Sequence, residues 1–280
     1  MMRLPIVIMC VLYSGCSTAR ADLLHVYILT GQSNSLGTTE LEGDEFGPGT
    51  HPADAKTRFF WSNPKSRGSA DPNTIVLYGD SSGEIRTLQM QQGNDVNPTF
   101  WGPEIGMART LFDAGHSNVM VIKVSRGGGG NGFWRPTSGH MANHLMQQID
   151  LALSAAKDAG HIFMVKGFLY LQGESNSEAE AAEADGHFQS LIDVLRMHIN
   201  SEYPGTADDM YSVIAEIAAN TTNASRIQTT DLQRELAAKS PRIGFIPTRD
   251  LPLKSDNLHF GRDSKLEIGR RSADAFMRQE

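Results

Sequence analysis

The chain has 280 residues, of which 40% are hydrophobic and 20% are charged, and its formal net charge at pH 7 is −7. This composition describes a globular protein, and the length is enough for a large core within one domain. The negative charge argues against binding to DNA, RNA or an anionic membrane surface, because these partners attract basic proteins.

The first 21 residues have the pattern of an export signal. Arg3 is followed by an apolar stretch over residues 4–13 and then by small residues, and the stretch is too short to span a membrane. Two processing sites compete: an Ala-x-Ala sequence ending at Ala21, and a loose lipoprotein box ending at Cys16, where a lipid anchor would be attached. A short buried helix is the alternative, but no polar residues give the segment a second face. We therefore expect an exported protein that is periplasmic, secreted or lipid-anchored at the cell envelope, with a single domain over residues 22–280.

Both cysteines, Cys10 and Cys16, fall inside this signal. The processed chain is therefore expected to have no disulfide and no thiol nucleophile, so that packing must stabilise it. Its formal charge would change from −7 to −9, because Arg3 and Arg20 are removed.

Five apolar runs rich in β-branched or aromatic residues predict buried strands, and segments with helical spacing lie between them. This alternation predicts an α/β fold, a three-layer α/β/α sandwich of the flavodoxin-like kind, with a parallel sheet of about five strands covered by helices on both faces. The predicted strands span residues 23–29, 119–124, 162–171, 210–217 and 243–246, and the predicted helices span residues 101–114, 141–159, 178–203, 224–239 and 264–277.

Residues 38–99 are an exception, since they are rich in Gly, Pro, Asp, Asn and Gln and show no sustained period. We expect an irregular insertion after the first strand that forms a rim or lid over a site, because loops of this length are usually functional or disordered. Within it, residues 74–78 and 84–88 predict a hairpin, and residues 58–61 indicate another short strand.

Ser33 lies in the sequence Gly31-Gln32-Ser33-Asn34-Ser35, directly after the first predicted strand. Open α/β sheets bind their ligands at the carboxyl ends of such strands, and a following helix would point backbone N–H groups at the serine. Ser33 is therefore a candidate nucleophile. The alternative is an ordinary turn and helix cap, which is the commoner use of small polar residues after a strand.

Asp256 and His259 stand three residues apart in a polar segment just before the last predicted helix. A serine hydroxyl needs a base near neutrality within hydrogen-bond reach, and the base needs a carboxylate that fixes its tautomer. The Asp-x-x-His sequence can supply both groups from one turn. The alternative is a turn capped by Asp256, with His259 on the surface.

Two other predicted strands end in residues suited to an oxyanion hole. One is followed by Ser125, Arg126 and the glycines 127–130, and the next by Gln172, Gly173 and Glu174. A tetrahedral oxyanion needs preorganised N–H donors, which a closely approaching glycine backbone and the Gln172 carboxamide can provide. A flexible loop and a polar helix cap are the alternatives. Because these segments and Ser33 all follow predicted strands, one crevice would gather them.

Taken in order, these motifs resemble the SGNH hydrolases, in the branch that contains sialate O-acetylesterases and plant and bacterial carbohydrate acetylesterases. The resemblance covers the chain from about Leu23 to the last helix. It implies an SGNH-type fold and an esterase that works without a metal or an organic cofactor. The motifs that carry it are Gly31-Gln32-Ser33-Asn34, Trp101-Gly102-Pro103-Glu104, Lys123-Val124-Ser125-Arg126-Gly127-Gly128 with Trp134, Gln172-Gly173-Glu174-Ser175 and Asp256-x-x-His259.

By this resemblance Ser33 would be the nucleophile, His259 the general base and acid, and Asp256 its orienting partner. The backbone N–H groups of Ser33 and Gly128, together with the side chain of Gln172, would donate to the oxyanion. These roles agree with those derived from the residues themselves.

Asn34 and Glu174 would support the site. Glu174 could brace the histidine, bind backbone N–H groups or touch the sugar, and Gly127 could take the place of Gly128 in the oxyanion hole. Ser35 and Asn176 depart from the family pattern, which often has Met and Asp there. These departures bear on the shape of the acyl pocket and on the surroundings of Glu174.

We therefore predict a serine esterase that removes acetyl groups from carbohydrate hydroxyls. Arg126 and Arg135 flank the glycine-rich segment beside Trp134, where a guanidinium could pair with a substrate carboxylate while the indole stacks on a sugar ring. That arrangement would favour an acidic sugar such as sialate or a uronate. The alternative is that both arginines form surface ion pairs of little energetic value.

Two other functions compete with this prediction. One is a catalytically inactive carbohydrate-binding protein on the same fold, with Trp101 and Trp134 stacking on sugars, although the intact serine, histidine and aspartate argue against it. The other is an esterase for lipid or aryl esters, which the polar insertion disfavours. His140 and His144 have a spacing that can hold a metal, but no third ligand lies in an identifiable motif, so solvated histidines are expected.

Overall fold

The computed structural model describes residues 23–37, 47–65, 75–77, 82–93, 99–218 and 222–279. The expected export signal over residues 1–21, including Cys16, lies outside the described residues. Residues 38–46, 66–74, 78–81 and 94–98 of the insertion also lie outside them, and with them part of the expected rim or lid.

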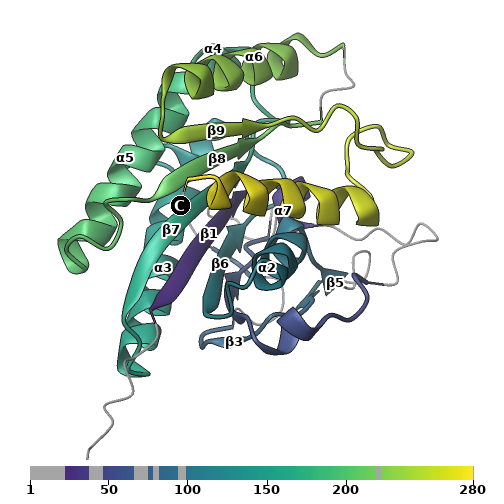
Figure 1. Ribbon diagram of the computed structural model, residues 1–280. Helices are drawn as coiled ribbons and strands as arrows, with labels where there is room; N and C mark the ends of the chain where they lie inside the picture. Colours follow the sequence, from purple (N-terminus) through teal and green to yellow (C-terminus); the bar gives the residue numbers. More distant parts are fainter. Residues whose placement is uncertain are drawn as a thin grey trace, which may run out of the picture.

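Within these described ranges, seven strands form one mixed sheet, and two short strands pair separately. The strands are β1 (Leu24–Gly31), β2 (Arg58–Ser62), β3 (Arg86–Thr87), β4 (Gln91–Gln92), β5 (Thr99–Phe100), β6 (Val119–Ser125), β7 (Phe163–Leu171), β8 (Tyr211–Ala215) and β9 (Ile243–Ile246). The order in the main sheet is β3-β2-β6-β1-β7-β8-β9, so β1 is central (Figure 1). Every neighbouring pair is parallel except β2 and β3. The carboxyl ends of β1, β6 and β7 therefore open at the same edge.

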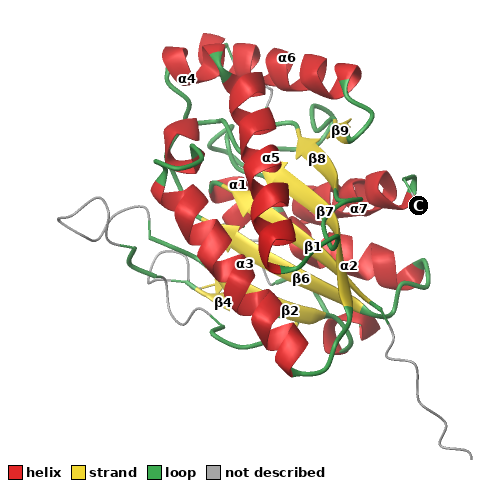
Figure 2. Cartoon of the chain, turned by 90° about the vertical axis from the view of Figure 1, so that its left-hand side faces the viewer, coloured by secondary structure: helices red, strands yellow, loops and turns green. Residues whose placement is uncertain are grey.

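Helices cover both faces of this sheet, which confirms the predicted α/β fold. They are α1 (Ser33–Leu36), α2 (Pro103–Asp113), α3 (His140–Asp158), α4 (Glu178–Ala182), α5 (Ala184–Glu202), α6 (Ala224–Lys239) and α7 (Arg262–Met277), with 3-10 turns at Pro52–Ala55 and Asn131–Trp134. Figure 2 shows α3 and α5 on one side of the strands and α2 and α7 on the other. Among the helices in the described ranges, none combines the length and hydrophobicity that crossing a bilayer requires.

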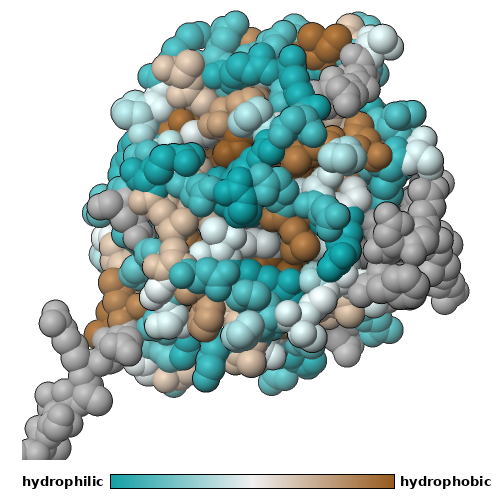
Figure 3. Space-filling model, turned by 45° about the vertical axis from the view of Figure 1, so that its right-hand side comes forward, coloured by the Kyte–Doolittle hydropathy of each residue, from teal (hydrophilic) through white to brown (hydrophobic). Residues whose placement is uncertain are grey.

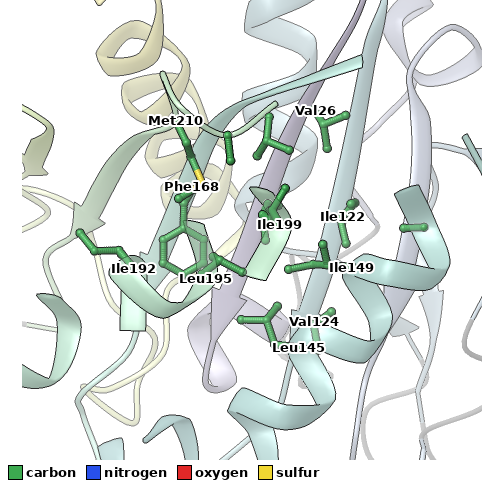
Figure 4. Close-up of a cluster of buried hydrophobic side chains, with 14 of the residues drawn as sticks. Val26, Ile122, Val124, Leu145, Ile149, Phe168, Ile192, Leu195, Ile199 and Met210 are labelled. Atoms are coloured by element: carbon green, nitrogen blue, oxygen red, sulfur yellow. The ribbon is translucent and has the colours of Figure 1, made fainter. Parts of the chain in front are cut away.

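Successive residues of β1 belong to two different cores, because side chains alternate across a strand. Val26 and Ile28 pack in the core under α3 and α5, and Tyr27 and Leu29 pack in the core under α2 and α7. Figure 4 shows the first of these cores, where side chains from the strands meet side chains from the two helices. A strand covered on both faces needs apolar residues at every position, which explains the continuous apolar run in the sequence.

The short strand predicted over residues 58–61 of the insertion is confirmed. Residues 58–62 form β2, which adds a sixth parallel strand beside β6. The predicted hairpin is wrong in its described part, since Leu77 bridges to Pro64 while Arg86 and Thr87 pair with β2. The backbone N–H and C=O groups along the outer edge of β2 need hydrogen-bond partners. Residues 86–87 pair with this edge, and not with residues 74–78 as predicted.

The segment predicted as one helix over residues 178–203 forms two helices, α4 and α5, which are separated at Glu183. Ser177 begins α4 with a capping box, in which its hydroxyl accepts from the backbone N–H of Glu180 and its own N–H donates to the Glu180 carboxylate. The same carboxylate accepts the N–H of Gly132 at 2.7 Å. The short helix α4 is thereby tied to the glycine-rich segment after β6.

Candidate active site

Ser33 lies at the carboxyl end of the central strand. β1 ends at Gly31, and Ser33 is the first residue of α1. Gly31 has a φ of +149°, and a Cβ at this position would lie 1.9 Å from the carbonyl oxygen of Leu171. Glycine is therefore required for the turn that carries the chain from the strand into α1.

The structure brings together the three residues predicted to form a relay. Oγ of Ser33 lies 2.9 Å from Nε2 of His259, and Nδ1 of His259 lies 2.5 Å from Oδ2 of Asp256. With Nδ1–H donating to the carboxylate, Nε2 has the lone pair that can accept the serine proton. Ser33 and His259 are 226 positions apart in the sequence, so the fold creates this contact. Their catalytic roles remain predictions.

A tight turn fixes the carboxylate of Asp256 relative to the imidazole. Oδ1 accepts the backbone N–H groups of Leu258 and His259, each at 2.9 Å. Asn257, inside the turn, has a φ of 53°, which asparagine tolerates better than most residues. Partial burial opposes ionisation of Asp256, but the hydrogen bonds from His259 and Leu258 outweigh it and lower the pKa of the carboxyl. The arrangement therefore holds a negative charge beside the ring.

The two supporting residues are buried next to this turn. Nδ2 of Asn34 donates to Oε1 of Glu174 at 2.7 Å and to the carbonyl of Leu258 at 3.1 Å, and Oδ1 accepts the N–H of Phe260 at 3.0 Å. Burial raises the pKa of the Glu174 carboxyl, against the hydrogen bond from Asn34, which lowers it. Of the three roles considered for Glu174, a brace on the histidine segment is the one this geometry supports.

Side chains that follow β7 brace the glycine-rich loop. Nε2 of Gln172 donates to the carbonyl of Gly129 at 3.0 Å, and Oδ1 of Asn176 accepts the N–H of Asn131 at 2.9 Å. Gly128, the glycine predicted for the oxyanion hole, lies between the end of β6 and these two contacts. Its backbone has a left-handed φ of 65°. The loop is therefore held at several points, in contrast to the flexible loop considered as an alternative.

We expect Gln172→Ala to lower kcat by roughly a hundredfold or more, because it removes a candidate oxyanion donor and the brace on Gly129. Steady-state hydrolysis of a small acetyl ester measures this effect. Gln189→Ala is the control, since the amide of Gln189 donates to the carboxylate of Asp193, one turn further along α5 on the exposed side of that helix. Equal kcat values for the two variants would show that Gln172 does not stabilise the oxyanion.

Trp134 is not at the surface, contrary to the prediction. Its indole is fully buried in the core under α3 and α5, and its Nε1–H donates to Oγ1 of Thr30 at 3.1 Å. The 3-10 turn at Asn131–Trp134 directs this ring inward, so the expectation that it stacks on a sugar is wrong. Trp101, the second ring in the sugar-binding alternative, is also fully buried.

The two arginines predicted to recognise a carboxylate already have partners within the protein. The guanidinium of Arg126 lies 4.2 Å from the centroid of the Phe133 ring and donates to the carbonyl of Gly128 at 3.0 Å. Arg135 is exposed and pairs with Glu183 at 3.4 Å, which is the surface ion pair of the alternative interpretation. Arg126 therefore shapes the loop, and the geometry does not favour Arg135 as a substrate ligand.

Arg226 is a cation near the site that the sequence did not indicate. It lies in the first turn of α6, is half-buried, and donates from Nε to the backbone carbonyl of Glu174 at 2.9 Å. Its Nη1 and Nη2 make no hydrogen bond to the part of the chain that the structure describes. No motif marks this residue, because its position depends on how α6 packs beside the end of β7.

A buried ion pair lies beneath the helix that carries Ser33. Lys123 of β6 and Glu104 of α2 are fully buried, 2.8 Å apart. Nζ of Lys123 also donates to the carbonyl of Leu36, the last residue of α1, and to Oε1 of Gln91, each at 2.8 Å. Burial lowers the pKa of Lys123, while Glu104 acts to raise it. Both residues stand in motifs of the resemblance, but their pairing was not predicted.

We expect Lys123→Met to reduce the free energy of unfolding by roughly 3–5 kcal/mol, because it leaves the Glu104 carboxylate buried without its cation. Urea denaturation measures the change. Arg135→Met is the matched control, since it removes an exposed pair with Glu183 and should cost less than about 1 kcal/mol. A similar small effect for both variants would contradict the structural importance of the buried pair.

His144 is buried, contrary to the expectation of a solvated histidine. Its Nε2 lies 2.8 Å from Oγ of Ser62, and burial lowers the pKa of the ring to about 4. His140 packs edge-on against Phe133. Within the described ranges, no three histidine, cysteine, aspartate or glutamate side chains cluster as metal ligands.

A serine, a histidine and an aspartate in hydrogen-bond contact at the carboxyl edge of a mainly parallel α/β sheet form an arrangement that is suited to acyl transfer. The chain belongs to the carbohydrate esterase family described as sialic acid-specific acetylesterases, whose sequence profile matches residues 23–278. It is accordingly a carbohydrate O-acetylesterase, with an acetylated carbohydrate as its substrate.

Solved structures share this fold at low sequence identity. A protein from Arabidopsis thaliana matches with a TM-score of 0.65 and 18% identity, covering 91% of this chain and 98% of its own. NanS matches with a TM-score of 0.57 and 14% identity, covering 92% and 98%. A carbohydrate acetylesterase from Xanthomonas citri matches with a TM-score of 0.57 and 16% identity, covering 89% of this chain and 55% of its own. No curated protein sequence matched the chain.

Proposed function

We propose that the protein hydrolyses O-acetyl groups on carbohydrates through an acetyl-serine intermediate on Ser33. The observation that carries this proposal is the continuous hydrogen-bonded relay from Ser33 through His259 to Asp256 at the carboxyl edge of the sheet. In this relay one ring nitrogen faces the hydroxyl and the other faces the carboxylate, which is the arrangement that activates a serine near neutral pH.

In the first half-reaction, Oγ of Ser33 forms a bond to the acetyl carbon as Nε2 of His259 takes the hydroxyl proton. The former carbonyl oxygen becomes negatively charged, and the N–H groups of Ser33 and Gly128 with the Gln172 amide would stabilise it. Collapse of this intermediate breaks the bond to the sugar oxygen. That oxygen takes the proton from Nε2, and the sugar leaves as an alcohol.

The second half-reaction returns the enzyme to its starting state. A water molecule gives a proton to Nε2 of His259 as its oxygen attacks the acetyl carbon. The tetrahedral intermediate then releases acetic acid as Oγ of Ser33 takes the proton back from Nε2, and the acid ionises to acetate in solution. The ionised Asp256 stabilises the imidazolium that forms in both halves.

We infer that the substrate is an acidic sugar and that Arg226 contacts its carboxylate. Arg226 is held by its Nε on the backbone carbonyl of Glu174, in the segment after β7, and this places a half-buried cation next to a residue that supports the candidate site. We expect Arg226→Ala to raise KM for O-acetylated sialate roughly tenfold and to leave KM for acetylated xylo-oligosaccharides nearly unchanged, because only the acidic sugar loses a charged hydrogen bond. Loss of the bond from Nε to the Glu174 carbonyl should affect kcat on both substrates alike. Arg135→Ala is the control and should leave both KM values unchanged. Equal increases of KM on the two substrates would contradict an acidic-sugar preference.

Acetate release from a panel of acetylated sugars tests the proposed reaction, with longer acyl esters and a Ser33→Ala blank run beside it. We expect Ser33-dependent release from at least one acetylated sugar and poor hydrolysis of long acyl chains. Release of acetate that is unchanged in Ser33→Ala would contradict the serine mechanism.

Two observations weigh against the alternative functions. The buried Trp101 and Trp134 cannot form the aromatic platform that the inactive sugar-binding protein requires. On the face shown in Figure 3, apolar residues are scattered among hydrophilic ones across the described part of the chain, which does not favour a lipid esterase. The signal-like residues 1–21 lead us to propose further that the enzyme acts outside the cytoplasm.

A further inference from the structure

Asn34 and Glu174 form a buried polar pair beside the candidate nucleophile and base. Asn34 follows Ser33 in α1, and Glu174 follows the end of β7, so the pair joins two neighbouring strand ends. The residues are only 2% and 4% exposed. Burying an amide and a carboxyl group costs free energy unless they form hydrogen bonds. The bonds that these two side chains form therefore indicate what the pair does.

The amide of Asn34 bonds to the peptide groups on both sides of His259. Its Nδ2 donates to the carbonyl of Leu258 at 3.1 Å, and its Oδ1 accepts the N–H of Phe260 at 3.0 Å. A flipped amide would set oxygen against oxygen and N–H against N–H. Only one orientation of Asn34 therefore holds the histidine segment.

Glu174 selects that orientation. An ionised carboxylate accepts hydrogen bonds and cannot donate, so its contact at 2.7 Å requires the NH₂ side of Asn34. The backbone carbonyl of Glu174 accepts from Nε of Arg226 at 2.9 Å, which ties the same residue to α6. Asn34 of α1 thus contacts the backbone around His259 directly, and the segment after β7 and the first turn of α6 support it through Glu174.

We propose that Asn34 and Glu174 are positioning residues, in which the carboxylate orients the amide and the amide holds both peptide groups that flank His259, so that Nε2 stays over the hydroxyl of Ser33. This inference rests on the proposed function, since it takes His259 as the base for Ser33. A misplacement of about 1 Å at a catalytic group costs roughly a hundredfold in rate, so positioning alone has a large effect.

Asn34→Asp tests this clamp through the pH dependence of kcat. The substitution keeps the shape of the side chain but places a second carboxyl group beside Glu174, where two charges repel and neither can donate to the carbonyl of Leu258. At low pH one shared proton restores a donor; at high pH the proton is lost. We expect the ratio of kcat in the variant to kcat in the parent to fall roughly tenfold or more between low and high pH, because only the variant loses a donor with this proton.

A second substitution should rescue the first. In Asn34→Asp combined with Glu174→Gln, the new amide donates to the new carboxylate, which still accepts the N–H of Phe260, so only the bond to Leu258 is lost. We expect the double variant to recover most of the kcat lost at high pH, with KM for a small acetyl ester unchanged. If Asn34 and Glu174 only stabilised the fold, the substitutions would shift the urea midpoint, but the loss of kcat at high pH and its recovery in the double variant would not be seen.

Asn200→Asp is the matched control. The amide of Asn200 also donates to a carboxylate, that of Asp208 at 2.8 Å, and accepts a backbone N–H, that of Ala207 at 2.9 Å, but it lies near the end of α5. We expect this variant to keep the parent profile. Parent-like profiles in Asn34→Asp, or a double variant no better than the single one, would overturn the clamp while leaving Ser33-dependent hydrolysis intact.

A spectroscopic readout separates failure of the clamp from failure of the proposed function. If hydrolysis persists in Ser33→Ala, the proposed mechanism is wrong, and the low-field NMR resonance of the proton between His259 and Asp256 then tests the clamp without any substrate. Its loss in Asn34→Asp and its retention in Asn200→Asp would support the clamp. An unchanged resonance in both variants would overturn it.

Discussion

Ser33→Ala should reduce kcat for a small acetyl ester by roughly 10⁴- to 10⁶-fold, to the level that binding and the oxyanion donors alone can sustain. The hydroxyl is the atom that would form the bond to the acetyl carbon, and it lies 2.9 Å from Nε2 of His259. Removing it leaves the ring with no proton to accept from the chain. The stability of the variant should match that of the parent, because the change deletes one partly accessible oxygen.

A side-by-side measurement with Ser35→Ala makes this test specific. Ser35 lies two residues further along α1, and its hydroxyl is 2.7 Å from that of Ser125, buried and away from the histidine. We expect Ser35→Ala to keep most of the parental kcat. Comparable activities for the two alanine variants would show that Ser33 is not the nucleophile.

Asp256→Asn should lower kcat by roughly 10³- to 10⁴-fold. The carboxylate faces Nδ1 of His259 at 2.5 Å and holds the ring in the tautomer whose Nε2 accepts a proton. An amide can donate to Nδ1, which favours the opposite tautomer and leaves the imidazolium without a negative partner. The backbone bonds from Leu258 and His259 to Oδ1 can persist, so the turn itself should survive.

The pH dependence of kcat distinguishes the orienting role of Asp256 from a simple loss of the turn in the variant. The pKa of Asp256 is lowered, so the parent keeps its carboxylate ionised down to acidic pH. We expect Asp256→Asn to stay impaired relative to the parent at every pH from 5 to 9, on the order of the loss given for kcat above. Near-parental activity of the variant at any pH in this range would contradict the orienting role.

Much of the fold could be predicted because β6 and most of β1, β7 and β8 are buried on both faces. Such strands are apolar throughout, and a continuous apolar run is visible in one sequence. The carboxyl edge of the sheet then follows from topology, which is why Ser33, Gln172 and the glycine-rich loop could be placed together before any coordinates were known.

The parts that were wrong or missed depend on contacts between distant segments. β3 pairs with β2 because an exposed strand edge was available, which the turn-rich sequence around residues 79–83 did not reveal. Trp134 follows the glycines and suggested a sugar platform, but a 3-10 turn buries it against Thr30. The ion pair of Lys123 with Glu104 joins a strand to a helix, and no local pattern marks such a pair.

The proposed mechanism requires that the hydroxyl of Ser33 forms a covalent bond to the acyl group. Treating the full chain with a fluorophosphonate and locating the adduct by peptide mass spectrometry tests this point. We predict a single adduct on Ser33, lost in Ser33→Ala and strongly slowed in Asp256→Asn. An adduct on another residue, or an active enzyme that forms no adduct at all, would contradict it.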